Sequence, residues 1–235
     1  MLTFHLITIF PNIFNEYFNT SILKRAQDKD LIKIKIYNLR DFATDKHKTV
    51  DDRPYGGGPG MILKAEPIYK AIRYILKNLK KNKIENSKII LLTPQGKQFD
   101  QKIAQRYSKL KDLILICGHY EGVDARVEKF VDEKISIGPY VLTGGELPAM
   151  IIVDAVTRLV PGVIRSESLK EETNLKIENC KLKIVGEYPQ YTRPAVLTIK
   201  DKSGKIKILK VPKVLLSGHH QKIKEWRIKQ MTKNK

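Results

Sequence analysis

The sequence predicts an α/β fold in which helices cover both faces of a mostly parallel sheet, followed by a small, mainly helical C-terminal domain. Three short apolar segments are each followed by a polar or glycine-bearing loop, and stretches of helical periodicity separate them. Strands that alternate with helices are typical of a parallel sheet. After Pro161-Gly162 the sequence becomes charged and poor in large apolar residues, which predicts a domain boundary near residues 165–175.

The N-terminal third contains two predicted strands and one predicted helix. Residues 2–10 are rich in β-branched and aromatic side chains and stop at Pro11, which favours a buried strand. In residues 32–37 isoleucine alternates with lysine or tyrosine, so we expect a strand with one face in water. From Glu66 apolar residues recur at helical spacing, and Pro67 stands in the first turn, where its missing N–H costs little.

The middle of the chain contains three more predicted strands, at residues 88–92, 113–117 and 134–137, and each leads directly into a loop. In parallel sheets, ligands bind outside the carboxyl ends of the strands. We therefore expect the loops at residues 93–96, Gly118 and Gly138 to form one site. Helices are predicted near residues 100–110, 123–131 and 147–159.

The C-terminal part begins with a charged segment that has few large apolar residues, and residues 166–187 are interpreted as a flexible linker. Order is expected to resume at residues 188–197. Residues 206–211 alternate like a strand, and residues 223–231 are predicted to be helical.

Composition favours a cytoplasmic protein with a polyanionic partner. A formal charge of +19 favours nucleic acid, because phosphate contacts release counterions, although a Lys-rich solvated surface is the alternative interpretation. Cys117 ends an apolar run and is expected to be a buried small hydrophobe, and its spacing to Cys180 suggests neither zinc nor a disulfide framework. The N-terminus lacks a basic start and a cleavage site, and no apolar stretch is long enough to span a membrane.

The segment DDRPYGGGPGM at residues 51–61 is the most unusual in the chain. Its glycines and prolines exclude a helix or a regular strand and would let a backbone, phosphate or base approach closely. A nucleotide P-loop does not fit, because no Gly-Lys-Ser/Thr follows. A tight structural turn remains the alternative to a loop that contacts the substrate.

Six motifs resemble the bacterial tRNA (guanine-37-N1)-methyltransferase family, and they occur in that family's order over nearly the whole chain. They are DDRPYGGGPGM, TPQG at 93–96, CGHYEGVDARV at 117–127, SIGPYVLTGGELPAM at 136–150, YPQYTRP at 188–194 and LLSGHH at 215–220.

This resemblance implies an enzyme that transfers a methyl group from S-adenosylmethionine to N1 of guanosine 37, 3′ of the anticodon. It further implies a homodimer of the SPOUT class with the active site at the subunit interface. Residues 1–165 would form a trefoil-knotted methyltransferase domain, and residues 188–235 a tRNA-binding domain. Family members commonly continue with more helix beyond the position of Lys235. The tRNA-binding domain of this chain is therefore expected to be shorter than theirs.

The methyl donor carries no phosphate, so backbone groups approaching through glycines should hold it better than lysines would. Apolar side chains could wall its adenine, and Glu121 could face a positive group of the donor. The expected donor-binding residues are Leu92, Thr93, Pro94, Gln95, Gly96, Gly118, Tyr120, Glu121, Ile137, Gly138, Pro139, Tyr140, Val141, Leu142, Gly144, Gly145 and Pro148.

Methylation at guanine N1 needs a base for the N1 proton and a positive donor near O6, where negative charge builds. The resemblance implies Arg158 as that donor, and the alternative is an ion pair with Asp154 one turn away. It implies Glu172 as the base, because this chain has Glu171-Glu172-Thr173 where the family usually has Glu-Asp-Ser. Asp154 and Glu171 remain alternative bases, and assistance by Mg²⁺ is left open.

Contacts with tRNA are expected from the glycine-rich segment and from the C-terminal domain. Tyr188 and Tyr191 could stack on bases or be ordinary core aromatics. The alternative function is a basic RNA-binding relative with weak or no catalysis, and a third alternative is methylation of another base or of ribose. The expected RNA-binding residues are Asp51, Arg53, Tyr55, Gly57, Gly58, Arg193 and His219.

Overall fold

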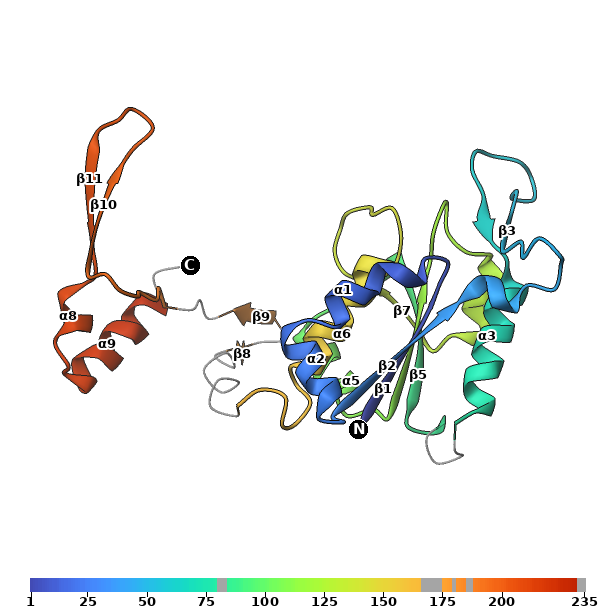
Figure 1. Cartoon of the computed structure of the whole chain (residues 1–235), viewed down its shortest axis with the longest axis horizontal. Helices are drawn as coiled ribbons and strands as arrows, with labels where there is room; N and C mark the ends of the chain where they lie inside the picture. The colour runs from blue at the N-terminus through green and yellow to red at the C-terminus, as the bar shows by residue number, and fades with distance from the viewer. Residues whose placement is uncertain (80–83, 166–174, 179–180, 185–187, 232–235) are drawn as a thin grey trace. The chain divides into compact units, whose positions relative to one another are not determined.

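The computed structural model describes residues 1–79, 84–165, 175–178, 181–184 and 188–231 (Figure 1). The chain divides into two compact units, Met1–Arg165 and Ser166–Lys235. In the described part of the chain, no helix has both the length and the apolar character that a membrane crossing requires.

A five-stranded parallel sheet forms the centre of the first unit, with strand order β2-β1-β6-β5-β7. The most buried strands lie in the middle: every residue of β1 and of β6 is buried. At the edge, β2 exposes its lysines and partly buries its isoleucines, as the alternation predicts. The strands are β1 (Leu2–Thr8), β2 (Ile32–Asn38), β5 (Ser87–Gln98), β6 (Asp112–Cys117) and β7 (Glu133–Ser136).

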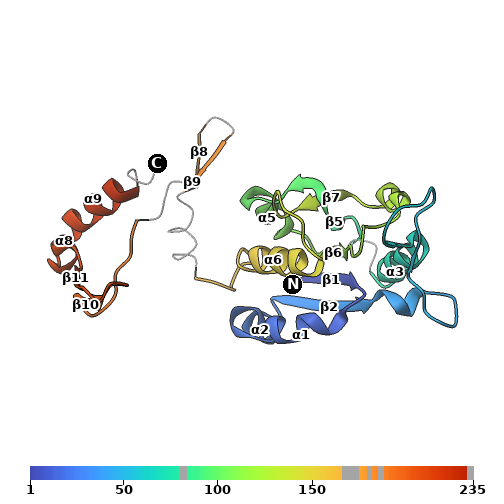
Figure 2. The same cartoon turned by 90° about the horizontal axis from the view of Figure 1, so that it is seen from above.

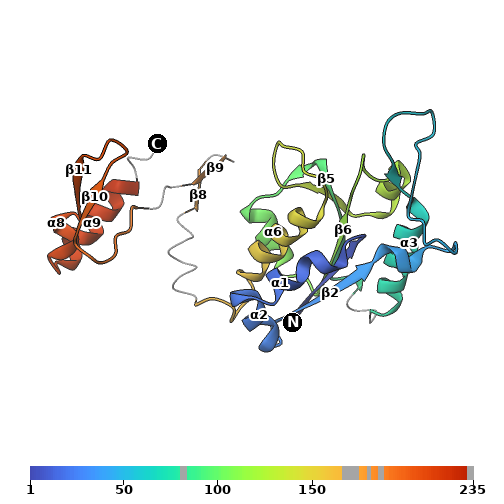
Figure 3. The ribbon, with the colours of Figure 1, turned by 45° about the horizontal axis from the view of Figure 1, so that its top comes forward.

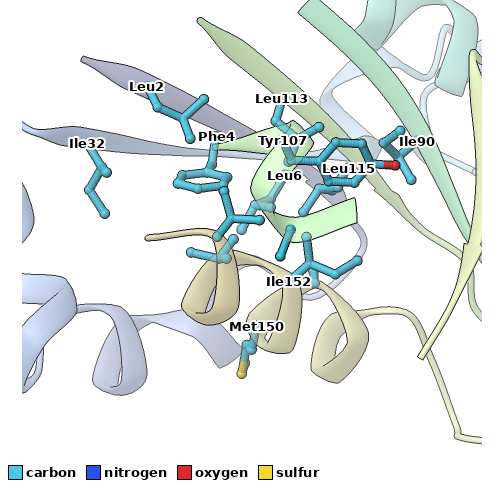
Figure 4. Packing of buried hydrophobic residues seen from close by; sticks show 14 of the residues in the cluster. Leu2, Phe4, Leu6, Ile32, Ile90, Tyr107, Leu113, Leu115, Met150 and Ile152 are labelled. Carbon is cyan, nitrogen blue, oxygen red and sulfur yellow. The ribbon is translucent and has the colours of Figure 1, made fainter. Parts of the chain in front are cut away.

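Helices cover both faces of this sheet, as Figures 2 and 3 show. One face packs against α2 (Ser21–Asp28), α5 (Gln101–Tyr107) and α6 (Glu146–Thr157). Figure 4 shows this layer, in which Leu2, Phe4 and Leu6 of β1 point toward α6 and Ile152 lies on the helix side that faces them, while Met150 points away from the sheet. The helix α6 is apolar on more than one side: one side is buried in the core, while Leu147 and Ile151 stay exposed on another.

The other face packs against α3 (Ala65–Lys77) and two 3₁₀ helices, η2 (Leu39–Phe42) and η3 (Ala125–Phe130). The two short strands β3 (Asp51–Asp52) and β4 (Ile62–Leu63) pair on this side and enclose the glycine-rich segment. Because side chains of a strand alternate between faces, the same strands supply both apolar layers.

The five strands and three of the helices lie where periodicity predicts them, so the α/β class is confirmed. The expected helix at residues 123–131 is the shorter 3₁₀ helix η3. The helices η1 (Pro11–Phe14), α1 (Asn15–Phe18) and α2 have no counterpart in the sequence prediction. Residues 93–96, expected as a loop, lie within β5 as a bulge: Leu92 and Lys97 both pair with Ile135 of β7.

The second unit contains two antiparallel hairpins and two helices. The first hairpin, β8 (Leu175–Glu178) with β9 (Lys181–Ile184), falls inside the segment expected to be a linker. The second joins β10 (Val196–Lys200) to β11 (Ile206–Lys210). The helices are α8 (Lys213–Leu216) and α9 (His220–Met231).

Candidate active site

A cleft of about 280 Å³ opens at the carboxyl ends of β5, β6 and β7. The bulge of β5, the loops that follow β6 and β7, and the turn that precedes α6 all line it. Thus the segments that the sequence predicts to meet do meet. The lining residues are Leu91, Leu92, Thr93, Pro94, Gln95, Gly118, His119, Tyr120, Glu121, Gly122, Val123, Ile135, Ser136, Ile137, Gly138, Tyr140, Val141, Leu142, Thr143, Gly144, Gly145 and Pro148.

Two of the expected donor-binding residues, Gly96 and Pro139, do not line this cleft. Gly96 serves the packing of the bulge instead. A Cβ on Gly96 would collide with the backbone nitrogen of Ile135. Glycine at this position therefore lets the end of β5 approach β7 closely.

Gly145 and Gly118 join the turn before α6 to the end of β6. The Gly145 N–H donates to the Gly118 carbonyl at 2.7 Å, and a Cβ on Gly145 would meet the Cα of Cys117 at 2.7 Å. Around Gly118, by contrast, a Cβ would come no closer than 3.4 Å to its nearest neighbour, the Leu92 carbonyl oxygen. Gly145 is therefore required for backbone packing, whereas Gly118 leaves room in the cleft.

The third loop is braced by its own side chains. The Ser136 hydroxyl donates to the Gly138 carbonyl at 3.0 Å, and the Tyr140 hydroxyl donates to the Ile137 carbonyl at 3.3 Å. The Tyr140 ring lies over Gly138 and occupies the place that a Cβ there would need. This arrangement leaves Tyr140, Val141 and Leu142 exposed at the rim of the cleft.

The glycine-rich segment is tied to the cleft at its C-terminal end. The Glu121 N–H donates to the Met61 carbonyl at 3.1 Å, and the Glu121 side chain lies against Gly60, where a Cβ would be 2.6 Å from its Cγ. Gly60 has φ +78°, a conformation that favours glycine. The tip stays open, since Tyr55 is fully exposed and Arg53 is exposed. Asp51 is half-buried in β3, and Gly57 and Gly58 lie at the exposed tip with positive φ.

A buried polar cluster beside the cleft was missed by sequence reasoning. Glu146, the first residue of α6, is 4% exposed and accepts a hydrogen bond from the Thr8 hydroxyl at 2.7 Å. Its other carboxylate oxygen lies 3.8 Å from Nδ1 of His119, which lines the cleft. The signal in the sequence was a histidine between Gly118 and the tyrosine of CGHYEG, and a glutamate directly after Gly144-Gly145.

Cys117 is a buried, free thiol at the end of β6, as predicted. Burial, and secondarily the charge of Glu146, raises the pKa of this thiol well above its usual range. A thiol that stays protonated is a poor nucleophile, so Cys117 contributes packing in the core at the end of β6.

Of the two residues implied as catalytic, Arg158 is among the described residues and does not line the cleft. Glu172 and its neighbour Glu171 lie outside the described residues. Arg158 follows the last residue of α6, while the cleft contacts Pro148 near the start of that helix, so about 15 Å along the helix axis separates the two. Asp154, the alternative partner of Arg158, accepts a hydrogen bond from the Tyr17 hydroxyl at 2.5 Å. This contact raises the pKa of Tyr17 to about 12.

The expected RNA-binding residues Arg193 and His219 lie in the second unit and are both exposed. Tyr188 and Tyr191 pack on α9: the Arg227 guanidinium stands 4.7 Å from the Tyr188 ring centre, and Trp226 lies 6.3 Å from Tyr191. Within the described residues, no group of three or more His, Cys, Asp or Glu side chains could hold a metal ion.

Comparison with known proteins places this architecture in a family. The sequence profile of the family described as "tRNA (Guanine-1)-methyltransferase TrmD" matches residues 2–235. The chain belongs to this family.

Similar proteins match this chain in sequence over most of their own length. A tRNA (guanine-N(1)-)-methyltransferase of Dictyoglomus turgidum is 54% identical over 99% of this chain and 86% of its own. A protein of that name from Clostridioides difficile is 49% identical over 96% of this chain and 90% of its own. A crystal structure of tRNA (m1G37) methyltransferase from Aquifex aeolicus matches with a TM-score of 0.75 and 38% identity, over 99% of this chain and 90% of that one.

Membership in the tRNA (guanine-1)-methyltransferase family confirms the resemblance drawn from the six motifs. The match with the Aquifex aeolicus structure covers both units, so the α/β class with its additional C-terminal unit is shared.

Proposed function

We propose that this chain transfers a methyl group from S-adenosylmethionine to N1 of guanosine 37 in tRNA. Family membership supports methyl transfer to tRNA guanine, and the cleft at the carboxyl ends of β5, β6 and β7 supports a bound donor. The cleft is the observation on which the proposal depends, because parallel sheets bind their ligands at this edge.

The cleft fits a donor that lacks phosphate. Among the described residues that line it there is no lysine or arginine. Its volume of about 280 Å³ lies near the lower end of ligand pockets, about 300 to 1,000 Å³. The exposed rim residues Tyr140, Val141 and Leu142 offer apolar surface for an adenine, and the space beside Gly118 lets a ligand approach the backbone. When bound, the donor supplies an electrophilic methyl group on a sulfonium.

The chemistry requires this protein to remove the N1 proton and to stabilise charge at O6. We assign Glu172 as the base and Arg158 as the donor to O6, on the resemblance of their positions to the family pattern. Because about 15 Å of helix separates Arg158 from the cleft of its own chain, we assign the cleft and Arg158 of one complete site to different subunits. A role for Mg²⁺ stays an expectation.

A homodimer is supported by an apolar patch on the first unit. Phe10, Ile13 and Tyr17 are 45%, 50% and 42% exposed, and they lie on and next to η1 and α1, which pack beside α6. On α6, Leu147 and Ile151 are 52% and 45% exposed, one turn apart. Such clustered apolar exposure marks interaction surfaces. Sedimentation of the purified protein should give the mass of two chains.

Three finer features belong to the same proposal. The trefoil knot is proposed from membership in the family. Residues 166–187 are assigned as the linker between a donor-binding domain and a tRNA-binding domain, the second of which supplies Arg193 and His219. A cytoplasmic location follows from tRNA as the substrate.

Incubation with labelled methyl donor and unmodified tRNA, followed by digestion, tests the function. We expect 1-methylguanosine at position 37, and no label when guanosine 37 is replaced by adenosine. Tight tRNA binding without incorporation would favour the alternative, a basic RNA-binding relative without catalysis. Label in another nucleotide, or in ribose, would reassign the target.

A further inference from the structure

His119 is the one residue with a basic side chain among the described residues that line the cleft. Its ring is fixed from several sides. The Phe10 and Tyr120 rings both approach it edge-on, with ring centres 4.9 Å away. The Gly122 N–H donates to the His119 carbonyl at 3.1 Å, and a β-bridge joins His119 to Gly144.

Nδ1 of His119 faces the buried carboxylate of Glu146. Nδ1 is buried, while the side chain as a whole is 20% exposed, so the exposed part of the ring lies away from Nδ1. Nδ1 lies 3.8 Å from Oε2 of Glu146, so this edge of the ring is turned toward the carboxylate. An N–H on Nε2, on the other side of the ring, can then contact a ligand in the cleft.

Glu146 is itself held in place by two features of the fold. The Thr8 hydroxyl, at the end of β1, donates to Oε1 at 2.7 Å. The start of α6 carries partial positive charge from the helix dipole, which stabilises a carboxylate there. Glu146 is 4% exposed, so its charge is screened little by solvent and acts on its nearest neighbour.

Gly144 keeps this pair together. A Cβ on Gly144 would collide with both Oε2 of Glu146 and Nδ1 of His119, because it would lie directly between the two groups. The absence of a side chain at this position is therefore what allows the histidine and the carboxylate to face each other.

We propose that His119 contacts a reactant in the cleft by donating a hydrogen bond to an anionic oxygen, and that Glu146 and Thr8 are its positioning residues. This inference rests on the proposed function, which supplies two such oxygens. One is the carboxylate of the donor's amino-acid tail. The other is O6 of the target guanine, which gains negative charge as N1 loses its proton.

Two measurements on the full chain distinguish these oxygens. Calorimetry compares S-adenosylhomocysteine with methylthioadenosine, which lacks the amino-acid tail. Single-turnover methylation at saturating donor and tRNA reports the chemical step. If His119 holds the tail, His119→Phe loses about tenfold or more in affinity for the first compound only. If it contacts O6, donor affinity is kept and the single-turnover rate falls about 10- to 100-fold.

The variants separate charge from structure. His119→Phe keeps a ring for the contacts with Phe10 and Tyr120. His119→Arg supplies another N–H donor and should recover much of the loss. Glu146→Gln keeps an oxygen for the Thr8 hydroxyl but removes the charge, so it should reproduce part of the His119→Phe defect. It should add little in the His119→Phe background. Glu128→Gln, which neutralises a surface carboxylate paired with Lys134, is the matched control.

Several outcomes would overturn the inference. Unchanged affinity and rate in His119→Phe would do so. Equal, additive losses in the two single variants would indicate a structural role instead. A wild-type protein that transfers no methyl group would remove the proposed function itself, and that result is obtained before any variant is compared.

Discussion

At the scale of single residues, the glycines around the cleft serve two different purposes. Gly145 and Gly96 let one backbone pass close to another, and a side chain on either would meet main-chain atoms that cannot move aside. Gly118 lines the cleft with only ordinary contacts around its missing Cβ. The sequence alone predicts a donor-binding role for all three glycines. It cannot show which of them also lets two backbone segments pack closely, because the residue type is the same.

This difference predicts that Gly118→Ala and Gly145→Ala fail in different ways. Gly118→Ala should lower donor affinity about tenfold with little change in melting temperature, because its methyl group occupies ligand space. Gly145→Ala should lower the melting temperature, because its Cβ meets the backbone of Cys117 at 2.7 Å. Calorimetry and thermal unfolding on both variants check this; matching profiles would show that the two glycines are equivalent.

Glu172→Gln should reduce the single-turnover methylation rate about 100-fold or more while leaving donor affinity unchanged, because an amide cannot take the N1 proton. Glu171→Gln is the matched control, one residue away. A normal rate in Glu172→Gln would remove it as the base and direct attention to Asp154 or Glu171.

At the scale of elements, contacts between helices and strands define the cleft's surroundings. The helix α5 is joined to β7 by a cluster at Glu133, which accepts hydrogen bonds from Arg106 at 2.7 Å and from the buried Tyr107 hydroxyl at 3.0 Å. Since β7 ends at the cleft, this cluster anchors the strand that carries the third loop. Burial, and then the charge of Glu133, raises the pKa of Tyr107 above its ordinary range.

Tyr107→Phe should lower the free energy of unfolding by about 1 kcal/mol at neutral pH, because it removes one buried hydrogen bond. The folded pKa lies above the unfolded value of about 10, so the contribution of Tyr107 is complete below that pH and is lost as the pH rises further. Urea unfolding of both proteins across this range checks the sign. A gap that widens above about pH 10 would contradict it.

At the scale of the whole molecule, the cleft and Arg158 stand at opposite ends of α6. The length of the helix keeps the two apart within one chain. In the proposed homodimer, the exposed apolar residues on and beside α6 would form the contact through which a second chain completes the site.

This arrangement predicts complementation between two inactive proteins. Gly118→Val should block the donor cleft, and Arg158→Ala should remove the O6 donor. If each site combines the cleft of one subunit with Arg158 of the other, a mixed dimer contains one intact site. Coexpression should then recover about a quarter of wild-type activity, because half of the dimers are mixed. A mixture as inactive as its components would place both groups in one subunit.

The net charge of +19 predicts salt-sensitive tRNA binding. Affinity for tRNA should fall at least about tenfold between about 50 and 200 mM salt, because bound counterions are released when phosphates are contacted. Donor affinity is the internal control and should change little, since the described cleft residues include no lysine or arginine. Salt-independent tRNA binding would assign the lysines to a merely solvated surface.

Local patterns along the chain were enough to predict the strands of the central sheet and most of the helices. They also predicted the family and the meeting of three segments at one edge of the sheet. These features follow from periodicity and from motif letters, which need no knowledge of distant contacts. The same patterns did not reveal α1 and α2, whose short apolar stretches lie between strands.

Only the tertiary structure distinguishes the glycines that let backbones approach from the glycine that leaves space for a ligand. Packing between distant parts of the chain also brings His119, Glu146 and Thr8 together. Thr8 and Glu146 are 138 residues apart. Their contact depends on the position of β1 beside β6 and on the packing of α6 over both strands, and no local pattern encodes that order. The same holds for Arg158. The sequence motif makes it a catalytic candidate, but only the structure shows that the length of α6 separates it from the cleft.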